Sequence, residues 1–159
     1  NSEDPFYDFA PSVGYVPNCN IPAGPGVRVD TYLYPGCNVS GYYDSLIAKL
    51  ITYGGDFNEA RVRINNALSE FTIEGINTTI PIHKTIIEEP NFIKGNISTD
   101  YIEKYNIIEK MKQKRNHEYE DKAYAAISAI LLQSEYVKKS NLSPQRLNRI
   151  QKSKSGGFY

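Results

Sequence analysis

The spacing of apolar side chains predicts a half-buried β-strand over residues 27–34. Every second position of this segment belongs to one face, which carries Val27, Val29, Thr31 and Leu33. A period of two with one mainly apolar face is typical of a strand that covers a core. Pro-Gly pairs bound the segment on both sides, as expected for turns. The segment therefore predicts a strand with Arg28 and Asp30 on its polar face.

A second run, residues 46–53, is apolar on both alternating faces except at Lys49. Such a run is typical of a central strand that is covered on both sides. A lysine within it is unexpected, because lysine is rarely buried without a partner of opposite charge. We expect this run to pair with the first one, with Asp44 at the head of a buried strand.

Two helices are predicted after the two strands. Asp56 is a favourable N-cap, and Glu59 three residues later completes an arrangement like a capping box. The apolar stripe that follows predicts a helix near residues 57–71. Thr79 is expected to cap a second helix near residues 80–89, which ends at the proline that follows it.

The charge balance divides the chain. Residues 1–104 contain 7 Lys and Arg against 13 Asp and Glu, whereas residues 105–159 contain 11 against 5. The overall formal net charge of +0 hides this asymmetry. We therefore predict a domain over residues 1–105 and a basic extension over residues 106–159.

Within the extension, apolar side chains at helical spacing predict an amphipathic helix over residues 118–138, which needs a partner for its apolar face. Residues 146–159 are basic and rich in Ser and Gly, and are expected to be disordered when alone.

Together these elements predict an α+β fold. A small antiparallel sheet built on residues 27–34 and 45–53 is flanked by helices near residues 57–71 and 80–89, with an appended C-terminal helix.

No complete active site can be assembled from the sequence. It has no Gly-rich phosphate-binding loop, no His/Cys cluster with metal-ligand spacing and no nucleophile with a paired base. Cys19 and Cys37 are predicted to be free thiols of a reducing cytoplasm. The longest apolar run, residues 123–132, is too short for a bilayer, which needs about 20 residues. We therefore expect no membrane partner. The basic extension has few interleaved aromatic residues, so we expect no nucleic-acid partner either.

Asp44 and Lys49 are the best candidates for a functional pair, because a buried carboxylate without a partner would be costly. The alternative is a local salt bridge or a turn cap. Arg28 and Asp30 share one strand face. They form either a solvated pair of little energetic value or a charged patch that meets a partner.

Several motifs, taken together, resemble one known family. Gly-Pro-Gly-Val-Arg-Val-Asp stands at residues 24–30, Tyr-Tyr-Asp-Ser-Leu-Ile-Ala-Lys-Leu-Ile at residues 42–51, and Ile-Glu-Gly-Ile-Asn-Thr-Thr at residues 73–79. In this order and spacing they resemble the C-terminal domain of biotin carboxylase, the ATP-grasp component of acetyl-CoA, propionyl-CoA and pyruvate carboxylases. The resemblance covers about residues 1–105.

The resemblance implies a longer parent enzyme. In the family, bicarbonate is phosphorylated with MgATP, and biotin on a carrier protein is then carboxylated. The family's nucleotide-binding lid, general base and metal-binding glutamates precede the matched region. In the family, the motif that residues 1–5 resemble is preceded by Arg-Ile, and that arginine helps to hold bicarbonate and the biotin ring. We therefore expect a fragment that is inactive alone and binds no cofactor by itself, whereas its parent uses ATP, Mg²⁺, biotin and bicarbonate.

The resemblance also implies roles for single positions. Asp44 matches the aspartate of the Tyr-Tyr-Asp motif, which lies near the bicarbonate arginine and orients it, and Lys49 is a supporting candidate as an ion-pair partner. Thr99 aligns with the rim of the adenine pocket. Three further positions match the homodimer interface of bacterial biotin carboxylases, namely Pro25, Arg28 and Glu70.

The expected partners are the rest of the carboxylase subunit, a second copy of it, a biotin carrier protein and a carboxyltransferase, which chooses the final acceptor. No biotinylation motif of the Ala/Val-Met-Lys-Met type is present, so the carrier is expected to be a separate chain. One alternative is a non-catalytic assembly module that docks a multisubunit carboxylase through its C-terminal helix. Another is a different ATP-grasp ligase, such as a carbamoyl-phosphate or purine-pathway enzyme, which the run at residues 42–50 argues against.

Overall fold

The structure, a computed structural model, describes residues 1–140, except for the side chains of residue 135 and residues 137–140. The predicted disorder of residues 146–159 lies outside the described residues. Two units are distinguished, Asn1–Lys114 and Arg115–Tyr159, and each is described by itself. The predicted boundary near residue 105 stays a prediction.

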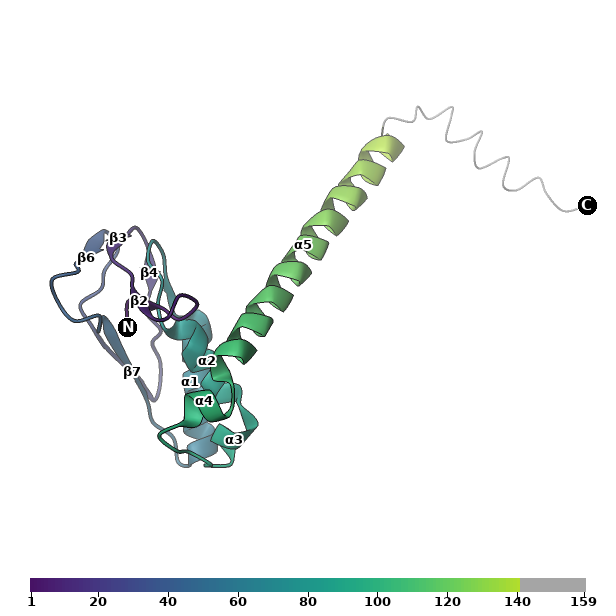
Figure 1. Cartoon of the computed structure of the whole chain (residues 1–159). Helices are drawn as coiled ribbons and strands as arrows, with labels where there is room; N and C mark the ends of the chain where they lie inside the picture. Colours follow the sequence, from purple (N-terminus) through teal and green to yellow (C-terminus); the bar gives the residue numbers. More distant parts are fainter. Residues whose placement is uncertain (141–159) are drawn as a thin grey trace, which may run out of the picture. The chain divides into compact units, whose positions relative to one another are not determined.

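In the first unit the strands β1 to β7 come first, followed by α1, β8 and the remaining helices (Figure 1). The strands are β1 (Glu3–Asp4), β2 (Ala10–Pro11), β3 (Gly14–Val16), β4 (Cys19–Asn20), β5 (Val27–Thr31), β6 (Cys37–Val39), β7 (Ala48–Thr52) and β8 (Thr72–Ile73). The helices are α1 (Phe57–Glu70), α2 (Ile80–Glu88), α3 (Pro90–Ile93), α4 (Tyr101–Lys104) and α5 (Ile107–Ser140), the last of which continues into the second unit.

The strands form four antiparallel pairs, β1–β2, β3–β6, β4–β8 and β5–β7. This confirms the α+β class, with small antiparallel sheets flanked by helices and a C-terminal helix. The two strands predicted from the sequence form the β5–β7 ladder, whose register runs from Val27 opposite Thr52 to Thr31 opposite Ala48. Helix α1 packs on this ladder, and α2 packs on α1.

The prediction that the second strand is covered on both faces is wrong. Along β7 the side chains alternate, with Ala48 and Leu50 half-buried and Lys49 and Ile51 exposed. Ile51 is 43 % exposed. A sheet with helices on one face leaves the other face to solvent, and an apolar sequence does not by itself supply a second layer. Lys49 therefore needs no buried partner.

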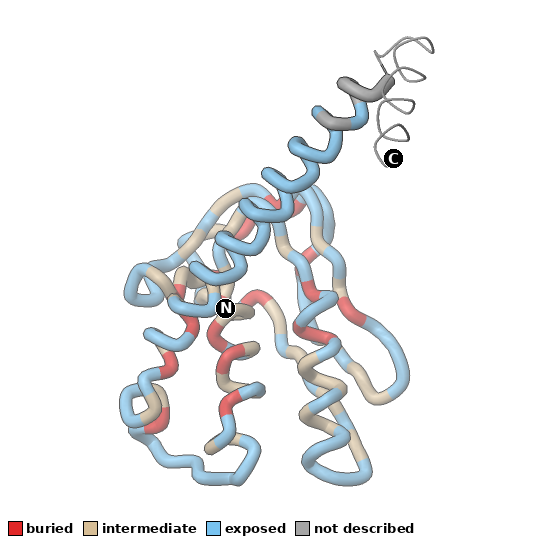
Figure 2. Tube along the Cα trace, turned by 90° about the vertical axis from the view of Figure 1, so that its right-hand side faces the viewer, coloured by how far each residue is buried: buried red, intermediate tan, exposed pale blue. Residues whose placement is uncertain are grey.

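The core of the first unit has two parts, which appear as red positions on the strands and helices in Figure 2. One lies among β3, β6 and the segments beside them, and comprises Val16, Leu33, Cys37, Val39 and Ile47. The other joins α2, α4 and the start of α5, and comprises Ile82, Tyr101, Ile107 and Met111. The first two turns of α5 thus belong to the core, although they lie in the basic extension of the sequence.

The helix starts agree in part with prediction. The Asp56 side chain accepts a hydrogen bond from the Glu59 amide at 2.8 Å, and the Glu59 carboxylate accepts one from the Gly55 amide at 2.6 Å. Thr79 precedes α2 but makes no side-chain cap bond. Thr79 is thus the N-cap residue of α2 as expected, but its hydroxyl accepts a hydrogen bond from the amino group of Asn1 at 2.9 Å instead of capping the helix.

A buried carboxylate joins three helices of the first unit. Glu89 is 5 % exposed, and its oxygens accept hydrogen bonds from the Asn91 amide at 2.7 Å, the Tyr101 hydroxyl at 2.7 Å and the Lys110 ammonium at 3.0 Å. Burial alone would raise the pKa of the Glu89 carboxyl. The hydrogen bonds from Tyr101, Lys110 and Asn91 outweigh it and lower this pKa from 4.5 to about 2.

These contacts predict a pH-dependent contribution of Glu89 to folding. Because the folded-state pKa is lowered, the stabilisation is present above the unfolded pKa and is lost as pH falls from about 4.5 through about 2. Glu89→Gln should lower the free energy of unfolding near pH 7 by about 3 kcal/mol. Urea unfolding at a series of pH values would measure this difference, which should shrink towards pH 2.

The adjacent Glu88→Gln is the matched control, because the Glu88 side chain is 40 % exposed and forms a surface ion pair with Lys114. It should leave stability nearly unchanged. An equal loss for both variants, or a loss for Glu89→Gln that does not depend on pH, would contradict the role of the ionised Glu89.

Candidate functional site

The Tyr-Tyr-Asp turn lies between β6 and β7 and is open to solvent. Tyr42 is 96 % exposed and Tyr43 is 84 % exposed. The Asp44 carboxylate accepts a hydrogen bond from the Leu46 amide at 2.8 Å, which fixes the turn that leads into β7. Asp44 itself is exposed, so the expectation that it heads a buried strand is wrong. The reason is that β7 begins only at Ala48, which leaves Asp44 in the preceding turn.

A surface hollow of about 570 Å³ adjoins this turn. Its lining combines aromatic, amide, hydroxyl and carboxylate groups, from Tyr32, Asn38, Ser40, Tyr43, Asp44 and Leu46. A hollow with few polar groups beside aromatic faces is suited to a planar polar ligand, which stacks on the ring and forms hydrogen bonds at its edge. Asp44 therefore lines this hollow with an exposed carboxylate.

The expected pairing of Lys49 with Asp44 does not occur among the ion pairs of the described residues. Lys49 lies directly opposite Asp30 in the β5–β7 ladder. It contributes to the lowered pKa of the Asp30 carboxyl, although the hydrogen bond from Arg28 is the largest cause. Lys49 is therefore part of the charged face of the ladder.

That charged face is organised by a bidentate ion pair. The Arg28 guanidinium donates to the two Asp30 carboxylate oxygens at 2.9 and 2.7 Å. These hydrogen bonds raise the pKa of Arg28 and lower that of Asp30. Both side chains are exposed, at 71 % and 44 %. An exposed pair of this kind adds little to stability. Its two hydrogen bonds nevertheless hold the Arg28 guanidinium, here called the Arg28 fork, in one orientation at the accessible surface.

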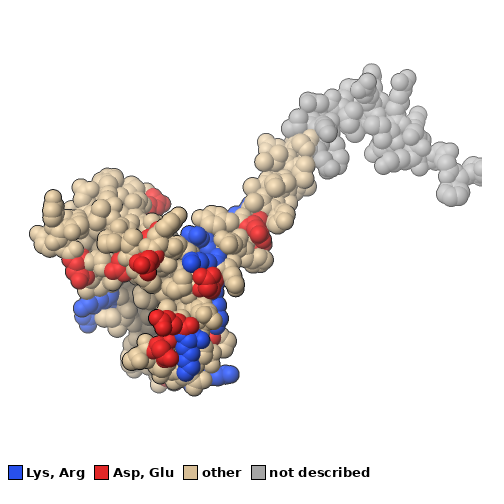
Figure 3. Space-filling view, in the orientation of Figure 1, with Lys and Arg blue, Asp and Glu red and all other residues tan. Residues whose placement is uncertain are grey.

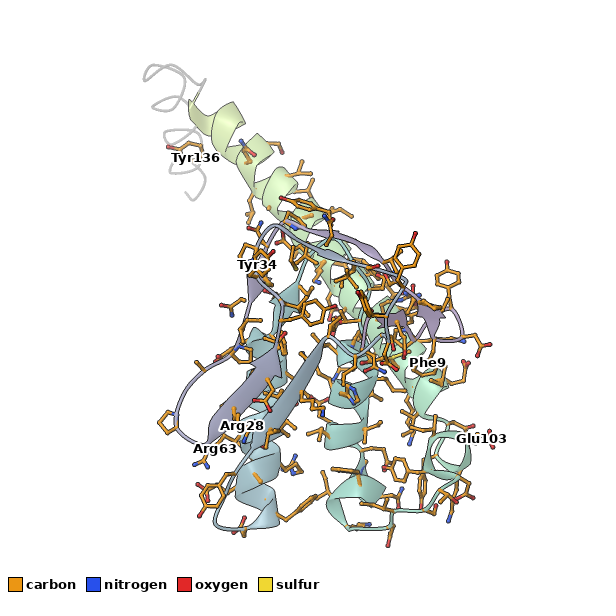
Figure 4. All side chains as sticks on the ribbon, turned by 90° about the vertical axis from the view of Figure 1, so that its left-hand side faces the viewer. Phe9, Arg28, Tyr34, Arg63, Glu103 and Tyr136 are labelled. Atoms are coloured by element: carbon orange, nitrogen blue, oxygen red, sulfur yellow. The ribbon has the colours of Figure 1, made fainter. Side chains whose placement is uncertain are left out.

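The end of the ladder that carries Arg28 is tied to α1. The Arg63 guanidinium donates to the Tyr53 carbonyl and, at 2.6 Å, to the Glu59 carboxylate. Figure 4 shows Arg28 and Arg63 at the same end of the two strands. Gly26 is required here, because its φ is +73° and an added Cβ would lie 2.9 Å from the Tyr53 oxygen. Pro25 is exposed in this turn.

The remaining predicted site residues lie elsewhere on the first unit. Glu70 is exposed at the last position of α1, two helical turns or about 10 Å beyond Arg63. Thr99 is exposed in the loop that precedes α4. The structure therefore brings Pro25 and Arg28 together at one turn, and places Glu70 and Thr99 on separate segments.

Charge is mixed on the first unit. On the face seen in Figure 3, acidic and basic groups lie interspersed. Within residues 1–140, no three His, Cys, Asp or Glu side chains gather where they could hold a metal ion. None of the helices in the same range has a stretch long and apolar enough to cross a membrane.

An apolar cavity of about 290 Å³, which we call the β7–α2 cavity, lies between β7 and α2 and was not predicted from the sequence. It is lined mainly by side chains of β7, α1 and α2, including Ala48, Leu50, Leu68, Phe71, Ile80 and Ile86. Asn1 also lines it. Periodicity identifies apolar faces but does not show whether they meet, so no sequence signal could have located this space.

Comparison with known proteins finds relatives for the first two thirds of the chain. Residues 1–104 match the family described as biotin carboxylase C-terminal domain. Biotin carboxylase 1 of Bacillus subtilis is 47 % identical over 108 residues, which cover 68 % of this chain and 24 % of the relative. Biotin carboxylase of Haemophilus influenzae is 50 % identical over 104 residues, which cover 65 % and 23 %. The chain thus spans about a quarter of the length of these relatives.

Solved structures show the same likeness. The biotin carboxylase domain dimer of Hydrogenobacter thermophilus 2-oxoglutarate carboxylase, in complex with MgADP and bicarbonate, matches with a TM-score of 0.66 and 38 % identity. The match covers 68 % of this chain and 24 % of that one. The biotin carboxylase subunit of a pyruvate carboxylase matches with a TM-score of 0.66 and 40 % identity, again over 68 % and 24 %.

Proposed function

Because the chain belongs to the family of biotin carboxylase C-terminal domains, we propose that it forms one wall of the active site of a longer biotin carboxylase. The parent is an ATP-dependent ligase of the cytoplasm that carboxylates biotin on a carrier protein, using MgATP and bicarbonate. The observation that carries the proposal is the exposed Tyr43–Asp44 turn beside its 570 Å³ hollow. This turn offers a carboxylate and an aromatic face to groups supplied by the rest of the subunit.

In this proposal Asp44 is a positioning residue. Its exposed carboxylate orients the arginine that holds bicarbonate, and the Leu46 amide holds the carboxylate in place. Lys49 supports the neighbouring charged face, and Thr99 contributes to the rim of the adenine pocket. Mg²⁺ is assigned to the remainder of the subunit, because the family's metal-binding glutamates precede the matched region. The chain alone is expected to be inactive.

The Arg28 turn is proposed as part of a homodimer contact, together with Pro25 and Glu70. The support is the accessible, preorganised Arg28 fork next to the rigid Gly26 turn. Charged groups at an interface fix register and suppress wrong partners more than they add affinity.

A second candidate function rests on the part of α5 in the second unit. Its apolar side chains are exposed, with Ile127, Ile130 and Leu131 at 54, 65 and 60 %. A helix with an uncovered apolar face needs a partner. We propose that this face docks the subunit onto the carrier protein or the carboxyltransferase.

The first prediction concerns Asp44 in the full-length enzyme. Asp44→Asn keeps an oxygen that accepts the Leu46 hydrogen bond but removes the charge. We expect kcat/KM for bicarbonate to fall by about 10- to 100-fold, because a misplaced binding group costs this much. The KM for ATP and the thermal stability should stay unchanged. Steady-state assays with free biotin would measure these values.

The exposed Glu103→Gln is the control for Asp44→Asn, because it removes one negative charge from α4 and should not affect turnover. Residues 1–159 alone serve as the blank and should show no biotin-dependent ATP hydrolysis. Wild-type turnover by Asp44→Asn would contradict the positioning role.

The second prediction concerns the dimer. Arg28→Glu in the full-length enzyme removes the guanidinium from the proposed contact and places a second carboxylate there beside Asp30, so it should raise the dimer dissociation constant at least about 10-fold. Sedimentation equilibrium would measure this constant. Lys94→Glu makes the same charge change at an exposed loop position and should leave the constant unaltered. If both variants dimerise equally well, Arg28 does not lie at the interface.

The third prediction concerns the second candidate function. The chain must be cut after Lys114, because Ile107 and Met111 are 0 % and 2 % exposed in the core. Removal of residues 115–159 should weaken holoenzyme assembly and spare carboxylation of free biotin. Removal of residues 141–159 alone is the control that leaves the exposed apolar side chains in place. Unchanged assembly after the longer deletion, measured by size-exclusion chromatography, would refute docking through α5.

A further inference from the structure

The turn that carries Asp44 is supported unequally on its two sides. Tyr42 and Tyr43, which precede Asp44, are almost fully exposed and pack little against the fold. Ile47, three residues after it, is buried and belongs to the core around β3 and β6. The position of the Asp44 carboxylate therefore depends mainly on the residues that lead from it into β7.

The far end of this short segment is fixed by β5. The Thr31 hydroxyl donates to the Ile47 carbonyl at 2.7 Å and accepts a hydrogen bond from the Leu33 amide at 3.1 Å. Thr31 is also the residue opposite Ala48, the first residue of β7. These contacts fix where β7 begins, and Ser45 is the next point towards Asp44 at which the segment is held.

Ser45, directly after Asp44, is held through both its backbone and its side chain. The Ser2 amide donates to the Ser45 carbonyl at 2.7 Å, and the Ser2 hydroxyl donates to the same carbonyl at 3.2 Å. The Ser45 hydroxyl in turn donates to the carboxylate of Glu3. Because Ser2 is buried, water competes little for its bonds to Ser45.

The Glu3 carboxylate is itself held in place. Glu3 lies in β1, where the ladder with β2 sets it opposite Pro11. Glu3 and Ser45 are both half-buried. The oxygen that accepts the Ser45 hydrogen bond also accepts one from the side-chain amide of Asn1 at 3.1 Å. Hydrogen bonds to a carboxylate are stronger than those between neutral groups, so Glu3 is a firm anchor for Ser45.

Asp4, the next residue of β1, makes a different connection. Its carboxylate accepts a hydrogen bond from the Phe6 amide at 2.9 Å and another from the Asn77 side chain at 2.9 Å. These bonds lead to the loop of the β1–β2 hairpin and to the segment before α2, whereas the bond of Glu3 leads to the Asp44 turn. Two adjacent carboxylates of one strand thus hold two different segments.

We propose that Glu3 is a positioning residue that acts through Ser45 on Asp44. The Glu3 carboxylate holds the Ser45 hydroxyl, and Ser45 holds the end of the turn from which the Asp44 carboxylate lines its hollow. Glu3 and Ser45 are 42 residues apart in the sequence, so no local pattern connects them. This inference rests on the proposed function, in which Asp44 orients the arginine that holds bicarbonate.

Hydrogen exchange tests the link between Glu3 and the turn without an assay of activity. In the full-length enzyme, Glu3→Ala removes the acceptor of the Ser45 hydroxyl. The Leu46 amide, which bonds to Asp44, should then exchange about 10-fold faster, because one hydrogen bond stabilises by about this factor. Asp4→Ala is the matched control and should leave this rate unchanged. Mass spectrometry with residue-level fragmentation would measure the rates.

Two further variants make this readout decisive. Ser45→Ala removes the same hydrogen bond from the donor side and should accelerate Leu46 exchange as Glu3→Ala does, which decides the matter if Glu3→Ala does not fold. Glu3→Gln keeps a side-chain oxygen that accepts from Ser45 and should restore most of the protection. Unchanged Leu46 exchange in Glu3→Ala or in Ser45→Ala would overturn the proposal.

Kinetics of the full-length enzyme separate positioning from mere stability. Glu3→Ala should lower kcat/KM for bicarbonate by about 10-fold, mainly through a higher KM for bicarbonate, and leave the KM for ATP unchanged. Asp4→Ala should leave all three values unaltered. A lower kcat with both KM values intact would indicate only a loss of folded enzyme, and would contradict the positioning role.

A double variant tests whether Glu3 acts through Asp44. Glu3→Ala combined with Asp44→Asn should lose no more kcat/KM for bicarbonate than Asp44→Asn alone, because residues that act as a unit are not additive. Losses that multiply would refute action through Asp44. If Asp44→Asn is impaired and Glu3→Ala is not, the role of Glu3 alone is refuted. Faster Leu46 exchange in Glu3→Ala, together with wild-type turnover by Asp44→Asn, would refute the proposed function and leave the link intact.

Discussion

The register of the β5–β7 ladder is the constraint on which the rest of the site depends. It places Asp30 between Arg28 and Lys49, so that the Arg28 fork is fixed at the surface without being buried. It also decides which backbone groups of β7 face outward. A shift of one residue would exchange the faces of every side chain along the strand. The charged face and the open edge are therefore two consequences of one pairing.

Periodicity predicted the elements of this ladder well, because alternation and helical spacing are local properties of the chain. It failed where the outcome depends on which other segments of the chain pack against an element. The run around Lys49 is apolar enough for a strand covered on both sides, yet Ile51 is 43 % exposed. For the same reason Asp44 was expected in a buried strand and lies in an open turn. Composition describes each face, and only tertiary packing determines what covers it.

Glu89 shows why charge composition does not locate the limit of a folded unit. The sequence becomes basic after residue 104, but Lys110 bonds to the buried Glu89, and Ile107 is fully buried. The first turns of α5 are therefore needed to neutralise a carboxylate and to fill a core. Beyond Lys114 the apolar side chains of α5 are exposed instead, so one continuous helix serves two physical purposes.

The two open features of the first unit have different physical requirements. The Tyr43–Asp44 hollow is an open surface hollow that combines aromatic surface with the polar groups of Asn38, Ser40 and Asp44, so a ligand there must replace water with hydrogen bonds of equal quality. The β7–α2 cavity is lined mainly by apolar side chains, so an apolar group is favoured there over water. The two spaces therefore select for different chemistry, although both adjoin the segment that leads into β7, through Leu46 for the hollow and Ile47 for the cavity.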